Sequence, residues 1–150
     1  MNQNQPVEIL LVEDNPNDVE LALHAFRKQN LTNQIFTVRD GEEALDFIFC
    51  TGAFKQRSSQ KAPKVILLDL KLPKISGLEV LKRIKSHQDT KTIPIVILTT
   101  SQEDRDVIES YKLGVNSYII KPVDFTQFSE SMRQIGLYWL LLNHLPSKTL

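Results

Sequence analysis

Three runs dominated by aliphatic residues stand out along the chain. They are Val7–Val12, Lys64–Asp69 and Ile93–Thr100. Their apolar residues are too continuous for half-exposed strands and are typical of parallel strands covered on both faces of a sheet. Two weaker runs, Gln34–Arg39 and Ser117–Ile120, fit further strands.

Helical patterns separate these strands. The first follows Asn15, a residue that caps helices, with Pro16 at the first helical position and Asp18 in the first turn. Further helices fit Gly41–Phe49, Gly77–Ser86, Gln102–Leu113 and a long last stretch from about Asp124 to Leu142. Five strands alternating with five helices predict an α/β fold, a doubly wound parallel sheet with helices on both faces.

Two segments do not follow a simple amphipathic pattern. Residues 51–63 are polar and aperiodic, which predicts an exposed and mobile loop. In the last helix one apolar stripe is expected to face the sheet, formed by Phe125, Phe128, Met132, Ile135, Trp139 and Leu142. The segment 137–142 is nevertheless apolar all round, which leaves Tyr138 and Leu141 for a partner unless the tail from Leu145 folds back over them.

Composition narrows the classes of protein. At 150 residues and 41% hydrophobic, the chain is expected to form one domain over residues 1–150, with its core at about 7–142. Its 18 basic and 18 acidic residues cancel, which argues against nucleic acid as a partner. A single cysteine, Cys50, and the lack of a signal peptide or a membrane span predict a soluble, cytoplasmic protein.

Polar side chains are expected where the strands end. Glu13 and Asp14 follow the first strand, Asp69 follows the third, Thr99 ends the fourth, and Lys121 follows the fifth. In an open parallel sheet, ligands bind at this edge. Crowded carboxylates without histidine or cysteine favour Mg²⁺, and an aspartate beside Mg²⁺ can act as a nucleophile toward a phosphoryl group.

Each of these residues also has an ordinary explanation. Acids such as Glu13 and Asp14 are common at helix starts. Asp69 could be an ordinary loop residue, Thr99 an ordinary residue at a strand end, and Lys121 a solvated charge on the surface. Their joint placement at strand ends favours a functional site.

The segments "LLVEDNP", "LLDLKLPKISG", "IVILTTS" and "SYIIKP" occur in an order and spacing that resemble the receiver domains of two-component response regulators. The resemblance implies the flavodoxin-like receiver fold. It also implies that Asp69 is the phosphoacceptor, which receives a phosphoryl group from a histidine kinase. It implies that Asp14, Asp69 and the backbone carbonyl of Lys71 hold Mg²⁺, with Glu13 acting through water. Many relatives carry a neutral side chain where this chain has Lys71.

The same resemblance assigns the remaining roles. Thr99 and Tyr118 match the switch pair, and Lys121 would bind a phosphoryl oxygen. The bond preceding Pro122 is expected to be cis. The long polar loop and the aromatic "LYW" near the end further resemble the stand-alone regulators of cyanobacterial and bacterial phytochrome kinases.

These observations predict a single-domain signalling protein without an output domain, which catalyses only its own phosphorylation and dephosphorylation. The family's usual dimer face is the fourth helix, fifth strand and fifth helix. We therefore expect a homodimer with Tyr138, Trp139 and Leu141 in its interface, and an unknown downstream protein. The alternatives are a Mg²⁺-dependent phosphatase and a phosphate-independent binding module. A nucleotide-binding module is disfavoured, because the turn "EDNPND" has no glycine.

Overall fold

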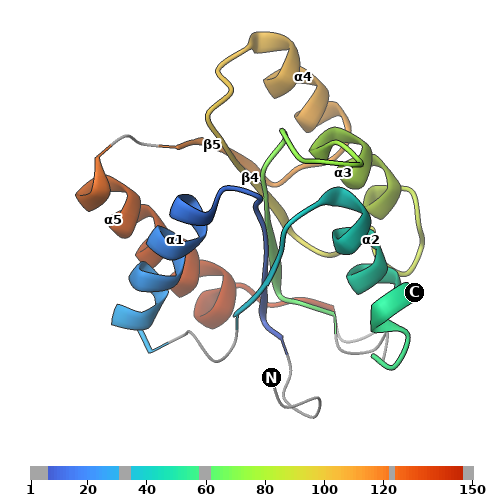
Figure 1. Ribbon diagram of the computed structural model, residues 1–150, viewed down its shortest axis with the longest axis horizontal. Helices are drawn as coiled ribbons and strands as arrows, with labels where there is room; N and C mark the ends of the chain where they lie inside the picture. Colours follow the sequence, from blue (N-terminus) through green and yellow to red (C-terminus); the bar gives the residue numbers. More distant parts are fainter. Residues whose placement is uncertain (1–6, 31–34, 58–61, 122–123, 147–150) are drawn as a thin grey trace.

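The computed structural model describes residues 7–30, 35–57, 62–121 and 124–146 (Figure 1). Five strands form one sheet in the order β2-β1-β3-β4-β5, and every neighbouring pair is parallel. The strands are β1 (Ile9–Val12), β2 (Ile35–Val38), β3 (Val65–Leu68), β4 (Ile95–Thr99) and β5 (Ser117–Ile120). This arrangement confirms the predicted fold.

The two faces of the sheet carry different helices (Figure 1). Ile9 and Leu11 of β1 belong to a core shared with α1 (Pro16–Lys28) and α5 (Phe125–Gly136). Leu10 and Val12 belong to a second core. That core is built with the helices α2 (Gly41–Phe49) and α3 (Gly77–Lys85), and α4 (Asp104–Lys112) contacts α3. Every residue of β1, β3 and β4 is buried, as the continuous aliphatic runs predicted.

Capping fixes where α1 begins. The Asn15 side chain accepts hydrogen bonds from the backbone N–H groups of Asn17 (2.9 Å) and Asp18 (3.2 Å), and Pro16 opens the helix. These bonds satisfy amides that a helix start otherwise leaves without a partner. The predicted cap is confirmed, and it sets the direction in which α1 leaves the end of β1.

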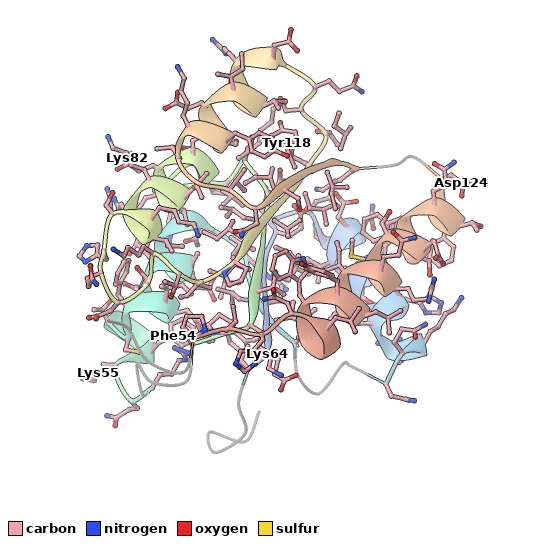
Figure 2. All side chains as sticks on the ribbon, turned by 180° about the vertical axis from the view of Figure 1, so that it is seen from behind. Phe54, Lys55, Lys64, Lys82, Tyr118 and Asp124 are labelled. Carbon is pink, nitrogen blue, oxygen red and sulfur yellow. The ribbon has the colours of Figure 1, made fainter. Side chains whose placement is uncertain are left out.

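The described part of the predicted loop, residues 51–57, is packed against the domain. It contains a short 3-10 helix, η2 (Gly52–Phe54), whose Phe54 ring lies 5.2 Å from the Phe47 ring and 5.8 Å from the Phe36 ring (Figure 2). Arg57 lies over the Phe47 ring and donates to the Phe47 carbonyl (2.7 Å). The predicted exposure is confirmed at residues 51–53, 55 and 56, whereas Phe54 and Arg57 pack against the Phe47 ring. The predicted mobility stays a prediction, and residues 58–61 lie outside the described part of the chain.

The last helix differs from the prediction near its end. The α-helix stops at Gly136 and continues as a π-helix, η3 (Leu137–Leu142), in which the Asn143 N–H donates to the Tyr138 carbonyl (2.7 Å). The wider π turn places the next inward residue five positions after Ile135, so Leu140 is buried and Leu142 is 73% exposed. Phe125 is 41% exposed, so the predicted stripe is wrong at both of its ends.

The partner surface predicted at this segment is only partly described. Tyr138 is 50% exposed as expected, whereas Trp139 packs against the core and contacts the Tyr138 ring edge-on. The Leu141 side chain is outside the described residues. Lys64, which precedes β3, donates to the Leu140 carbonyl (3.4 Å) and pairs with Glu8 (Figure 2). Within the described residues, no helix has the length and apolarity needed to cross a membrane.

Candidate functional site

The acids predicted at the strand ends come together. Glu13 and Asp14 follow β1 and Asp69 follows β3, which pairs directly with β1. One carboxylate oxygen from each lies within 4.8 Å of the others. Glu13 and Asp69 are buried, whereas Asp14 is exposed. The structure thus confirms that these three side chains form one cluster at the carboxyl edge of the sheet.

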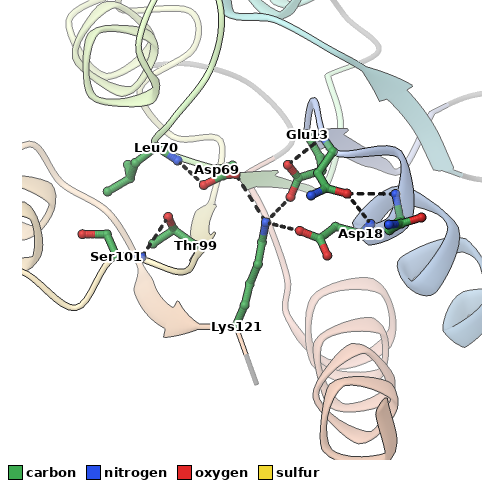
Figure 3. Close-up of polar contacts among 9 residues, drawn as sticks. Glu13, Asp18, Asp69, Leu70, Thr99, Ser101 and Lys121 are labelled. Carbon is green, nitrogen blue, oxygen red and sulfur yellow. Dashed lines mark hydrogen bonds and ion pairs between the residues drawn. The ribbon is translucent and has the colours of Figure 1, made fainter. Parts of the chain in front are cut away.

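Lys121 reaches into this cluster from the end of β5 (Figure 3). Its Nζ donates to a Glu13 carboxylate oxygen, to Asp18 (2.8 Å) and to Asp69 (3.3 Å). The side chain is only 7% exposed, so the alternative of a solvated surface lysine is wrong. Its backbone N–H donates to the Thr99 carbonyl (2.7 Å), which fixes the start of the side chain beside β4.

Asp18 is a member of the site that the sequence did not single out. It was expected only as an acid in the first turn of α1, yet its carboxylate bonds to Lys121. The sequence could have indicated this role through the short spacing between Asp18 and the acidic pair. The first turn of a helix that begins directly after β1 stays close to the end of that strand. The Lys121 contact itself joins distant parts of the sequence and has no local signature.

Burial and charge shape the electrostatics of the cluster. Burial raises the pKa of Glu13 from 4.5 to about 7, with the Asp69 charge adding to the effect and the Lys121 hydrogen bond opposing it. Burial alone would lower the pKa of Lys121, but the hydrogen bonds to Asp18 and Glu13 and the Asp69 charge raise it above its ordinary value. Lys121 therefore carries its positive charge at neutral pH.

Thr99 and Tyr118 are connected through the backbone of Ser101. Thr99 is fully buried at the end of β4, and its hydroxyl oxygen accepts from the Ser101 N–H (3.4 Å). The Tyr118 hydroxyl donates to the Ser101 carbonyl (3.0 Å). The Ser101 hydroxyl in turn donates to Asp106 of α4 (2.6 Å). The β4–α4 loop is thus the direct link between the predicted switch residues.

The loop after β3 holds Asp69 tightly. The Leu70 N–H donates to the Asp69 carboxylate (2.7 Å). A side chain at Gly77 would meet the Asp69 carbonyl oxygen at 2.2 Å, and one at Gly41 would meet the Ile75 carbonyl oxygen at 2.0 Å. Both glycines are therefore required by close backbone approach, a role that sequence reasoning did not assign.

Two predictions about the site stay predictions. Lys71 lies in this same loop with an exposed side chain, and its carbonyl as a metal ligand is an expectation from the family resemblance. The bond preceding Pro122, expected to be cis, lies outside the described residues.

The acidic cluster fits a hard divalent cation. All its donors are carboxylate oxygens, and its members lie close enough to share one ion. Asp69 also places a carboxylate, a group that can attack a phosphoryl group, 3.3 Å from the Lys121 ammonium group, whose charge can stabilise the transferred phosphoryl oxygens.

Comparison with known proteins agrees with this chemistry. The family model of the response regulator receiver domain matches residues 9–133. The chain belongs to this family. Membership implies a signalling role and a histidine kinase as partner.

Three relatives illustrate the similarity of this receiver to known proteins. The probable methanogenesis regulatory protein FilR2 of Methanothrix harundinacea is 39% identical over 146 residues, covering 97% of this chain and 92% of that protein. Response regulator Rcp1 of Synechocystis sp. is 38% identical over 144 residues, 96% of each chain. The crystal structure of its Mn²⁺-bound form has a TM-score of 0.84 and covers 92% of this chain and 97% of that chain.

The third relative is the cyanobacterial phytochrome response regulator RcpA, whose structure is of the phosphorylated form. It has a TM-score of 0.86 at 39% identity and covers 95% of this chain and 99% of that chain. The receiver is thus homologous to phytochrome response regulators over nearly its whole length.

Proposed function

We propose that this receiver accepts a phosphoryl group from a histidine kinase onto Asp69, in a reaction that depends on Mg²⁺. The observation that carries the proposal is the buried Asp69 carboxylate, held between an acidic pair and the Lys121 ammonium group. A carboxylate oxygen of Asp69 attacks the phosphorus, the phosphorus–nitrogen bond of the phosphohistidine breaks, and the imidazole nitrogen keeps the electron pair. The product is an acyl phosphate on Asp69.

The other residues take supporting roles in this proposal. Asp14, Asp69 and the Lys71 carbonyl would hold Mg²⁺, with Glu13 acting through water, and the bound ion would supply positive charge to the transferred oxygens. Lys121 donates a charge-assisted hydrogen bond to the phosphoryl group. Thr99 and Tyr118 couple phosphorylation to a change in the β4–α4 loop through their hydrogen bonds to Ser101.

The signal leaves the domain as a changed protein-binding surface. We propose that a phytochrome-type kinase is the partner, an assignment supported by the similarity to Rcp1 and RcpA. The cytoplasmic location stays a prediction from the sequence.

Intact mass measurement with a small phosphodonor tests the assignment of Asp69. The wild-type protein should gain one phosphoryl group with Mg²⁺ and none after chelation of the metal. Asp69→Asn keeps the size of the side chain but removes the nucleophile, so it should gain nothing. Asp104→Asn changes an exposed acid on α4 in the same chemical way and should match the wild type. A normal mass gain in Asp69→Asn would show that the acceptor is another residue.

A further inference from the structure

The ammonium group of Lys121 has no donor left for a new ligand. A lysine side chain offers three N–H donors. Here they are matched by three carboxylates, those of Glu13, Asp18 and Asp69. A phosphoryl group that needs Lys121 must therefore displace one of these acceptors.

The three acceptors are not equivalent. Glu13 and Asp69 belong to the acidic cluster of the proposed metal site, whereas Asp18 is not among its members. Asp18 comes from α1, and its side chain is 26% exposed, against 4% for Glu13 and 10% for Asp69. When the Asp18 bond breaks, the Asp18 carboxylate loses its partner, but water can reach it more easily than it reaches the other two carboxylates. This bond is therefore the least costly of the three to break.

We propose that Asp18 is a positioning residue that holds Lys121 in the unphosphorylated receiver and competes with the phosphoryl group for it. This inference rests on the proposed function and adds a residue to it. Asp18 acts through Lys121 and does not contact the reacting atoms. Its removal should free one N–H of Lys121 and favour the phosphorylated arrangement of the site.

The position of Asp18 also has a purely structural explanation. An acid in the first turn stabilises a helix through the helix dipole, whatever it contacts. That role predicts a loss of stability in a variant without the charge, and it predicts no gain in affinity for a phosphoryl group. The two explanations therefore lead to opposite results.

Beryllofluoride, which mimics a phosphoryl group on an aspartate, is the probe we choose. Its affinity is measured by fluorine NMR or calorimetry at saturating Mg²⁺, with the full chain. Asp18→Asn should bind it roughly 1.5- to 5-fold more tightly than the wild type, the range expected for losing a partly exposed competing ion pair. Asp18→Glu keeps the charge and should return the affinity to the wild-type value.

Asp104→Asn is the matched control, because Asp104 also lies in the first turn of its helix and is exposed. It should leave the beryllofluoride affinity unchanged. Equal or weaker binding by Asp18→Asn, in a protein that is still folded under the conditions of the measurement, would overturn the inference. If the wild type binds no beryllofluoride and takes no phosphoryl group, the proposed function itself fails.

Discussion

Lys121 and Lys85 both lose solvent around their ammonium groups, yet their pKa values move in opposite directions. Lys121 meets carboxylates, whose charge offsets burial. Lys85 donates to two neutral acceptors, the carbonyls of Lys91 (3.0 Å) and Ile93 (2.8 Å), so burial lowers its pKa below 10.5. The charge of the acceptor, more than the number of hydrogen bonds, decides the direction of the shift.

The lowered pKa of Lys85 makes stability depend on alkaline pH. Between its folded pKa and 10.5, the unfolded chain binds more protons than the folded one, so the free energy of unfolding rises with pH in this window. Lys85→Met should lack this contribution. Urea unfolding at several alkaline pH values should show the difference between wild type and variant growing with pH. A difference for Lys85→Met that stays constant over these pH values would refute the prediction.

Gly77 is expected to be as important to the site as any polar residue. Gly77→Ala forces its new methyl group toward the Asp69 carbonyl, so the loop must shift. We expect a loss of about 1–3 kcal/mol in unfolding free energy and slower phosphorylation of Asp69. At Gly114 a methyl group has room, but φ is +99°, so Gly114→Ala should cost stability without slowing phosphorylation. Equal phosphorylation rates in both variants would contradict this role.

At the scale of a residue, the sequence predicts where a side chain lies in the fold better than it predicts which side chains it contacts. Asp69 and Glu13 could be placed because each directly follows an aliphatic run, and the ends of neighbouring parallel strands share one edge. The bond between Asp18 and Lys121 could not, because it depends on the direction of α1 and on the reach of a long side chain from β5. Ser101 was missed because its backbone, rather than its side chain, joins Thr99 and Tyr118.

At the scale of elements, regular hydrophobic patterns predicted the strands and helices correctly, whereas the segments that interrupt these patterns were not predicted. The strands β1, β3 and β4 follow from continuous burial. The π-helix η3 has no such signature, since "LYWLLL" is apolar all round and is compatible with any helical phase. The packed turn η2 was hidden because one aromatic residue within a polar stretch determines its position.

The packing of η2 can be tested apart from the site. Phe54→Ala should lower the unfolding free energy by about 1–3 kcal/mol, because it removes ring contacts with Phe36 and Phe47 from a half-buried position. Lys55→Ala, at the neighbouring exposed position, should change it by less than about 0.5 kcal/mol. Chemical denaturation measures both. A Phe54→Ala protein as stable as the wild type would mean that this segment packs only weakly, as the sequence first indicated.

At the scale of the whole molecule, exposed apolar side chains occur on each of the elements expected to mediate self-association. Ile108 and Tyr111 of α4, Ile120 of β5, and Phe125 of α5 are exposed, as is Tyr138 of η3. Single exposed apolar residues are ordinary, and the Phe125 ring contacts His24 of α1, so these positions alone do not define one surface. The homodimer through α4, β5 and α5, with Tyr138, Trp139 and Leu141, stays a prediction.

Sedimentation at micromolar concentration tests the dimer. The wild type should sediment as a dimer, and Tyr138→Glu should yield a folded monomer that still accepts a phosphoryl group, because a charge is costly to bury in an interface. Lys55→Glu, which changes an exposed residue outside these elements, should leave the dimer intact. If the wild type is a monomer both with and without phosphorylation, the dimer is ruled out and the surface would instead bind another protein.

The strand order also determines how the protein comes together during its synthesis. β1 is made first but lies between β2 and β3, and β5, made last, closes the sheet beside β4. A nascent chain that ends before β5 contains Glu13, Asp14 and Asp69, the residues of the acidic cluster, but lacks Lys121. Such like charges repel and disfavour the compact state. Translation of the final strand therefore supplies the missing edge of the sheet, and Lys121, which directly follows that strand, offsets part of the negative charge of the cluster.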